Sequence, residues 1–129
     1  MNKRAIKDGK PLASEHQLQS AFVQWARAKE GKYPELRLAF AVPNAAKRSF
    51  ALAQIMRDEG LRAGVPDWWL PVPRKGFSGL VIEFKAPGKK VTDAQASYME
   101  MLLIEGWRVY TMNDWAMAAI VVETYLQPL

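Results

Sequence analysis

The sequence predicts an α/β fold, a small mixed four-stranded sheet with helices on both faces. Two observations support this prediction. Segments of helical and strand periodicity follow one another in the order helix, strand, helix, strand, strand, helix, strand, helix. A short link joins the second and third strands, which favours antiparallel pairing, whereas a helix between the third and fourth favours parallel pairing. With 129 residues, half of them hydrophobic, the chain is long enough to bury one core.

The chain begins with a basic arm and continues as one domain. Residues 1–13 are polar and basic and contain Gly9 and Pro11, so we expect them to be flexible unless a partner orders them. Residues 14–129 are expected to form the folded domain. No apolar run approaches the roughly 18 residues of a membrane span, and we expect a soluble cytoplasmic protein.

The first helix is expected over residues 14–29. Ser14 and Gln17 fit a capping box at its start. Its apolar stripe, at helical spacing, consists of Leu18, Phe22 and Trp25. Extending this stripe backwards by three residues reaches Glu15, so we expect the Glu15 carboxylate to lean toward the body of the protein. The alternative is a first-turn acid that only stabilises the helix N-terminus.

A strand and a helix are expected next. The strand covers residues 36–42 and is stopped by Pro43, after which Asn44 begins a turn. The second helix runs over about residues 46–59, with Gly60 in the usual C-terminal position. Its candidate core residues are Phe50, Leu52, Ile55 and Met56.

The rest of the chain supplies three strands and two helices. Residues 67–72 form a short second strand that we expect to end by Pro71, because proline cannot donate to a β ladder. The other expected elements are a third strand over 80–85, a third helix over 92–105, a fourth strand over 107–111 and a last helix from Asn113 or Asp114 to about Leu126.

The third strand carries two charges on one face. Its alternation places Leu80, Ile82 and Phe84 on one side, and the other side carries Val81, Glu83 and Lys85. Such a strand is expected to be central in its sheet, where charge is costly unless it is paired or binds a metal. Asp67 supplies a second carboxylate. Two carboxylates about 4 Å apart repel by roughly 4 kcal/mol at an effective dielectric near 20, so a cation between them is favoured.

The composition narrows the chemistry. There are no cysteines and a single histidine, His16, which excludes disulfides, thiolate zinc sites, Cys nucleophiles and hydrolytic sites built on paired histidines. Hydrolysis would have to use carboxylates, lysine and a hard metal ion, of which magnesium is the first candidate. The 18 Lys plus Arg against 13 Asp plus Glu give a net charge of +5. This excess favours a polyanionic partner, and the alternative is a solvated basic surface.

These residues resemble a known nuclease motif. The pattern Pro66-Asp67…Glu83-Phe84-Lys85 resembles the P-D…(D/E)-x-K motif of the restriction-endonuclease-like superfamily. Residues 58–67, residues 92–95 and the early helix with Glu15 together resemble the VRR-NUC (virus-type replication-repair nuclease) domain. The resemblance covers about residues 14–111, as in stand-alone copies that phages carry, whose location would be the host cell cytoplasm. One departure is Ala45-Ala46, where relatives commonly have glycines.

The resemblance implies a restriction-endonuclease-like core, Mg²⁺ or Mn²⁺ dependence without a small-molecule cofactor, and cleavage of branched double-stranded DNA by a homodimer similar to Holliday-junction resolvases. The catalytic residues that it implies are Asp67, Glu83, Lys85, Gln95 and Glu15. The implied metal ligands are Asp67, Glu83 and the main-chain carbonyl of Phe84, with Glu15 as a further candidate. Gln95 has an alternative role, because it also fits a capping box with Thr92.

Basic side chains flank these acidic positions and could contact DNA phosphates, although such residues are usually only solvated. They are Lys47, Arg48, Arg57, Arg62, Arg74, Lys75, Lys89 and Lys90. A competing interpretation is a DNA-structure-binding module on the same fold that does not cut, and a third is a basic α/β protein whose acids are merely salt-bridged. The complete set of implied catalytic residues favours the nuclease.

Overall fold

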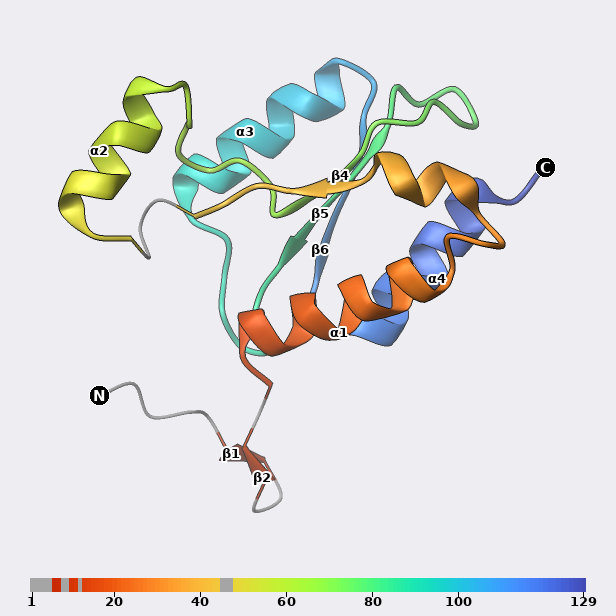
Figure 1. Ribbon diagram of the computed structural model, residues 1–129, viewed down its shortest axis with the longest axis horizontal. Coiled ribbons are helices and arrows are strands. Elements are labelled where there is room, and N and C mark those ends of the chain that lie inside the picture. The colour runs from red at the N-terminus through yellow and green to blue at the C-terminus, as the bar shows by residue number, and fades with distance from the viewer. Residues whose placement is uncertain (1–5, 8–9, 12, 45–47) are drawn as a thin grey trace.

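The computed structural model describes residues 6–7, 10–11, 13–44 and 48–129. Within these residues, a four-stranded mixed sheet in the order β3–β4–β5–β6 lies between helices (Figure 1). Its strands are β3 (Phe40–Ala41), β4 (Trp68–Leu70), β5 (Leu80–Phe84) and β6 (Arg108–Met112). The β4–β5 pair is antiparallel and the β5–β6 pair is parallel. Both pairings and the α/β fold class are confirmed.

Helices cover both faces of the sheet, as predicted (Figure 1). The helices are α1 (Glu15–Ala28), α2 (Phe50–Asp58), α3 (Asp93–Ile104) and α4 (Trp115–Leu126). The side chains of α1 and α4 share a core with Leu80, Ile82 and Phe84 of β5, while α3 packs on the opposite face. No described helix is long and apolar enough to cross a membrane.

Local sequence signals explain where these helices begin. Ser14 and Gln17 form the predicted capping box of α1, and Thr92 forms another with Gln95 at the start of α3. Asp114 caps α4 by accepting hydrogen bonds from backbone N–H groups of its first turn. The starts of α1, α3 and α4 are therefore set by the residues that the sequence indicates, whereas α2, expected from about residue 46, begins at Phe50 after a Ser49 cap.

Aromatic packing fixes α1 against the sheet. The Phe22 ring meets the Trp68 ring edge-to-face at 4.8 Å between centroids and lies 5.3 Å from the Phe84 ring. All five residues of β5 are buried, because β4 and β6 flank the strand and helices cover both faces. The prediction of a central third strand is confirmed, and Glu83 therefore lies inside the protein.

The predicted first strand is wrong over most of its length. Pro34–Leu38 forms a 3₁₀ helix, and only Phe40–Ala41 pairs with β4. Pro34 favours this turn because its fixed φ suits the first position of a helix and its missing N–H is not needed there. Leu36 is buried from the 3₁₀ helix rather than from a strand.

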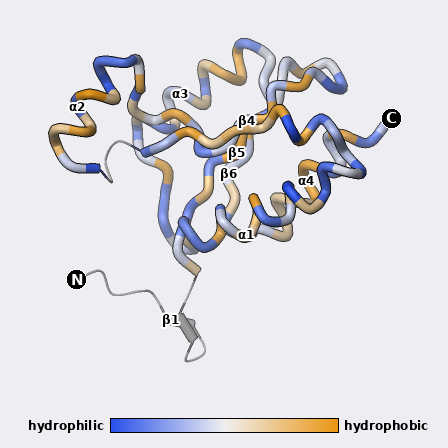
Figure 2. The backbone as a smooth tube through the Cα atoms, viewed as in Figure 1, coloured by the Kyte–Doolittle hydropathy of each residue, from blue (hydrophilic) through white to orange (hydrophobic). Residues whose placement is uncertain are grey.

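The predicted core face of the second helix is also wrong. Phe50, Leu52 and Ile55 are 84%, 44% and 53% exposed, whereas Ala53 is buried and Met56 is half-buried. Figure 2 shows that α2 carries hydrophobic residues although it lies at the edge of the molecule. The helical period was correct, but the sheet does not extend beneath this helix.

Part of the predicted N-terminal arm contains a short pair of strands. β1 (Ile6–Lys7) and β2 (Lys10–Pro11) pair antiparallel. The other arm residues before Ala13 lie outside the described residues, as do Lys47 and the Ala45-Ala46 turn.

Candidate active site

Asp67 is attached to the end of β5 through its side chain. Its Oδ2 accepts a hydrogen bond from the Phe84 N–H at 2.8 Å. The last backbone pair between β4 and β5 at this end is Trp68 with Ile82, so the Asp67 carboxylate continues the connection where the ladder stops. The Val42 N–H also donates to the Asp67 carbonyl at 2.9 Å. These contacts hold Asp67 beside the charged end of β5.

Glu83 is a buried acid with one oxygen left over. Its residue is only 3% exposed, and its Oε1 accepts a hydrogen bond from Gln95 Nε2 at 3.0 Å. Its Oε2 is buried without a hydrogen-bond partner among the described residues. Burial above all, and then the negative charge of Asp67, raise the pKa of Glu83 to about 8, while the Lys85 charge acts in the opposite direction. Burial and the Asp67 charge therefore disfavour the ionised form of Glu83 more than Lys85 favours it.

Lys85 directly follows β5 and lies two residues after Glu83. It is 9% exposed, and its backbone N–H donates to the Met112 carbonyl at 2.9 Å, which continues the pairing with β6. Residues two apart on a strand share a face, so the Lys85 side chain lies on the side of Glu83. A lysine with little water around it favours contact with an anionic group.

Gln95 forms the capping box and also contacts Glu83, while its catalytic role stays a prediction. Its Oε1 accepts from the Thr92 N–H at 2.9 Å, and its own N–H donates to Thr92 Oγ1 at 3.2 Å. The Nε2 of the same side chain donates to Glu83. The cap of α3 thus also orients the buried carboxylate.

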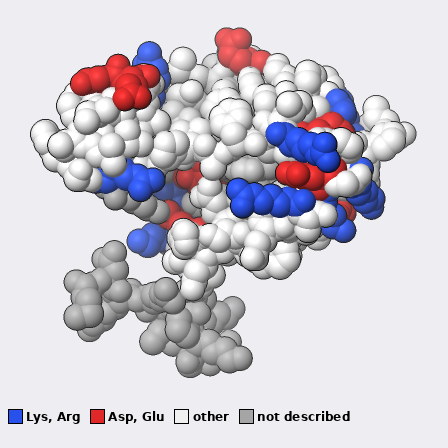
Figure 3. Space-filling view, in the orientation of Figure 1, with Lys and Arg blue, Asp and Glu red and all other residues white. Residues whose placement is uncertain are grey.

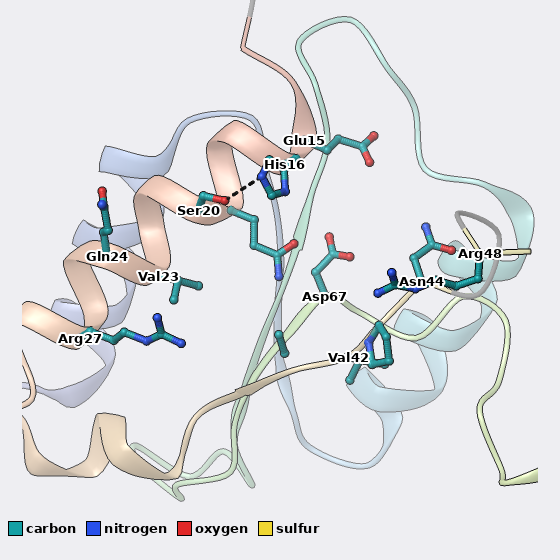
Figure 4. A pocket seen from close by; sticks show the side chains of 13 residues that line it. Glu15, His16, Ser20, Val23, Gln24, Arg27, Val42, Asn44, Arg48 and Asp67 are labelled. Carbon is teal, nitrogen blue, oxygen red and sulfur yellow. Dashed lines mark hydrogen bonds between the residues drawn. The ribbon is translucent and has the colours of Figure 1, made fainter. Parts of the chain in front are cut away.

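Glu15 lines a cavity of about 670 Å³ together with Asp67. In Figure 4 the Glu15 side chain comes from the start of α1, and Asp67 lies across the opening with Asn44 and Arg48 beyond it. A second cavity of about 330 Å³ also includes Asp67 and Asn44, and it reaches Gln95. Asp67 is therefore a shared wall of two adjoining cavities.

The predicted DNA-contacting residues fall into two groups. Arg48 lines the larger cavity, Arg57 and Arg62 line the smaller one, and Lys89 and Lys90 are exposed in the loop after β5. Arg74 and Lys75 lie in the turn at the opposite end of the β4–β5 pair from Asp67 (Figure 1). There Arg74 Nη2 lies 3.2 Å from Glu35 Oε2, and Lys75 Nζ donates to the Thr124 carbonyl.

Several residues at the cavities were not assigned a role from the sequence, among them Asn44, His16 and Arg27. Asn44, predicted only to begin a turn, lines both cavities. His16 lines the larger cavity next to Glu15, with its Nε2 3.5 Å from Ser20 Oγ. The sequence signal for Asn44 was its place directly after the Pro43 strand stop, and for His16 its place beside Glu15 on the helix.

Gly64 brings the loop before Asp67 against the start of α3. A Cβ at this glycine would lie 2.4 Å from the Ala94 carbonyl oxygen, and its φ is +81°. Only glycine combines this backbone conformation with such a close approach at low cost. Gly64 therefore helps to place Asp67 near Gln95.

Comparison with known proteins identifies the family. The VRR-NUC domain matches residues 5–115, which is most of the chain. The chain belongs to the VRR-NUC domain family. A solved structure described as a VRR_NUC domain protein has a TM-score of 0.72 and 25% sequence identity, with 88% of each chain covered. No curated protein matches the sequence. The VRR-NUC match gives the chain a nuclease-type fold and supports DNA binding.

The acidic pair of this VRR-NUC domain fits a divalent cation. Within the described part of the chain, no group of three or more His, Cys, Asp or Glu side chains could hold a metal ion. Mg²⁺, however, is commonly bound through one or two carboxylates with the remaining positions filled by water and substrate phosphate. The Asp67–Glu83 pair and the buried Glu83 Oε2 supply such oxygens. Carboxylate oxygens of this kind are the ligands that a hard divalent cation prefers.

Proposed function

We propose that this protein is a metal-dependent endodeoxyribonuclease that hydrolyses phosphodiester bonds in branched DNA, similar to a Holliday-junction resolvase. The observation that carries the proposal is the Glu83 carboxyl, which is buried beside Asp67 and Lys85 and has one oxygen that accepts no hydrogen bond from the described residues. A cation and a phosphate would satisfy this arrangement better than water or a salt bridge. Membership of the VRR-NUC family supports the same reaction.

Asp67, Glu83 and the main-chain carbonyl of Phe84 would hold Mg²⁺ or Mn²⁺, with Glu15 as a further candidate. When bound, the cation supplies Lewis acidity and positive charge for the phosphoryl oxygens. Lys85 donates hydrogen bonds to the attacking water or to the phosphate oxygen where negative charge develops. Gln95 keeps the Glu83 carboxylate in one orientation through its hydrogen bond to Oε1.

The DNA backbone would lie along the two cavities that meet at Asp67. Arg48 lines one cavity and Arg57 and Arg62 the other, so phosphates on either side of the scissile bond would meet positive charge. The exposed Lys89 and Lys90 extend this charge along the loop after β5. Asp67 and Glu83, which are the acidic part of the site, then need the cation to accept the same polyanion.

A dimer would allow two strands to be cut. One domain offers one such site, whereas symmetric cleavage of a four-way junction needs two sites related by a two-fold axis. The contact surface that we propose is α4, whose single charged residue is Glu123. Apolar helices without a polar face are normally buried, yet Met117 and Ile120 are 50% and 56% exposed. A second copy of α4 across the axis would bury both.

The test uses labelled four-way junctions, flaps, splayed arms and plain duplex, each with Mg²⁺ and with EDTA. We expect incision of a branched substrate with Mg²⁺ only, and none by Glu83→Ala protein, which should still bind. Metal-independent binding without products on any substrate would support the non-cleaving DNA-binding module instead. Absence of both binding and products would overturn the assignment to DNA.

A further inference from the structure

An aromatic side chain is held in solvent at the start of α2. Phe50 is the first residue of the helix and is 84% exposed. The backbone around it is fixed, because Ser49 Oγ caps the helix by accepting from the Leu52 N–H at 3.2 Å. The Phe50 ring is thus exposed to solvent, although the backbone that carries it is held by the helix cap.

In the sequence, Phe50 lies between two arginines that line the adjoining cavities. Arg48, two residues earlier, lines the larger cavity, and Arg57, seven residues later, lines the smaller one. Residues seven apart share a side of an α-helix and are about 10 Å apart along its axis. Phe50 therefore shares the side of α2 with Arg57, at the rim of the smaller cavity, although its ring lines neither cavity.

Only the rim of the hollow carries the positive charge that a polyanion needs. Figure 3 shows acidic groups recessed between the α2 and α1 ends of the molecule, with basic groups on the rim. Arginines on both sides of Phe50 can bind phosphates, and a ring between them can contact a base. In a continuous duplex the base faces are stacked on one another, whereas a branch point interrupts the stack and exposes a face.

We propose that Phe50 stacks on the base exposed at the branch point of bound DNA and thereby selects branched DNA over continuous duplex. This inference rests on the proposed function, because it requires the DNA to occupy the cavities beside Asp67. The side chain is a positioning group for the substrate and takes no part in the hydrolysis. Its contribution is made on binding, before any bond is broken.

The experiment measures binding in EDTA, so that cleavage does not intervene. Wild-type, Phe50→Ala, Phe50→Trp and Ile55→Ala proteins are titrated into a four-way junction and a duplex of equal length. The junction carries 2-aminopurine at the branch. We expect Phe50→Ala to weaken junction binding about five- to 150-fold, the range of one base stacked on an aromatic ring. Its duplex affinity should not change.

The two other variants separate stacking from simple loss of apolar surface. Phe50→Trp should restore junction affinity, and Ile55→Ala, which removes an apolar side chain 53% exposed on the same helix, should match wild type. Stacking on Phe50 should also change the fluorescence of the aminopurine in the wild-type complex, and this change should be lost with Phe50→Ala.

Three outcomes would overturn the inference. In the first outcome, wild type prefers and incises junctions, and Phe50→Ala has the same junction affinity and the same aminopurine fluorescence change as wild type. The Phe50 assignment then fails and the nuclease assignment stands. If wild type shows no preference for any branched DNA, both fail together. If Phe50→Ala instead lowers the molecular mass in light scattering, the ring belongs to a contact between protein chains.

Discussion

Gln95 Nε2 donates to Glu83 Oε1 at 3.0 Å, while Gln95 Oε1 accepts from the N–H that begins its own helix. One amide side chain therefore connects the start of α3 to the buried carboxylate on β5. The orientation of Glu83 depends on how α3 begins. A change in the cap of α3 should therefore also change the position of the Glu83 carboxyl.

Gln95→Ala should impair both stability and catalysis. Loss of the cap should cost about 1 kcal/mol of unfolding free energy, and loss of the bond to Glu83 should lower the rate of DNA incision about 10- to 100-fold. Gln17→Ala is the matched control, because Gln17 forms the same capping box at Ser14 without reaching the site. It should lose similar stability and keep its rate. Equal rates for the two variants would remove Gln95 from the site.

The metal-free protein should lose stability as the pH rises from about 5 to 8. The pKa of Glu83 is about 8 in the folded protein against an ordinary 4.5, so between these values the folded state binds the extra proton and unfolding releases it. The contribution of Glu83 is fully present below pH 4.5 and is lost as the pH passes 8. Thermal unfolding in EDTA should show this slope in wild type and a flatter one in Glu83→Gln. Parallel curves would contradict it.

Lys85→Ala should abolish most incision while DNA binding is retained. The Lys85 ammonium is the group that we place at the attacking water, and such a group contributes about 10²- to 10⁴-fold to a rate. Single-turnover incision and gel-shift affinity should be measured on the same junction. Lys89→Ala removes an equal charge from the exposed loop and should weaken binding slightly without changing the single-turnover rate. A Lys85→Ala protein that cuts normally would exclude its catalytic role.

Gly64→Ala should destabilise the fold more than Gly88→Ala. Both glycines have positive φ, +81° and +83°, but a Cβ at Gly88 would meet nothing within 4 Å, whereas one at Gly64 would meet the Ala94 carbonyl. The strained φ alone should cost about 1 kcal/mol in each variant. The additional loss in Gly64→Ala, measured by urea unfolding, reports the close approach of the loop to α3. Equal losses would show that the loop simply moves away.

If the proposed dimer forms through α4, Ile120→Glu should convert it into a monomer. A charge at each copy of this position would face its symmetry mate across the axis and repel it. Leu38→Glu is the control, because Leu38 is similarly exposed, 60% against 56%, but lies on the 3₁₀ helix. Light scattering at micromolar concentration should separate the two. A wild-type monomer, with and without DNA, would argue against the dimer itself.

Local signals predicted most of the fold, and long-range packing decided the rest. The capping boxes at Ser14 and Thr92, the charged face of β5 and the mixed pairing all follow from short patterns that the structure confirms. The exposure of Phe50 could not be predicted, because helical periodicity identifies an apolar face but not whether a sheet lies beneath it. Similarly, residues 36–38 were predicted to begin a strand but belong to the 3₁₀ helix that starts at Pro34.

For the candidate site, too, local sequence signals pointed to some residues, whereas others depended on long-range packing. The motif indicated Asp67, Glu83 and Lys85 because strand alternation and a strand start can be read from adjacent residues. Asn44 required three-dimensional information, since it reaches the cavities through the end of β3. No short pattern links that turn to Asp67, which is 23 positions later in the chain.

The hydrogen bond from the Phe84 N–H to Asp67 makes the two acids unequal as markers of activity. Asp67 secures the end of the sheet, so its side chain supports the fold whether or not the protein cuts DNA. Glu83 contributes less to the fold, because its buried Oε2 accepts no hydrogen bond from the described residues and lacks a partner unless a cation binds there. If the proposed function holds, retention of the glutamate in related chains is therefore a more informative sign of nuclease activity than retention of the aspartate.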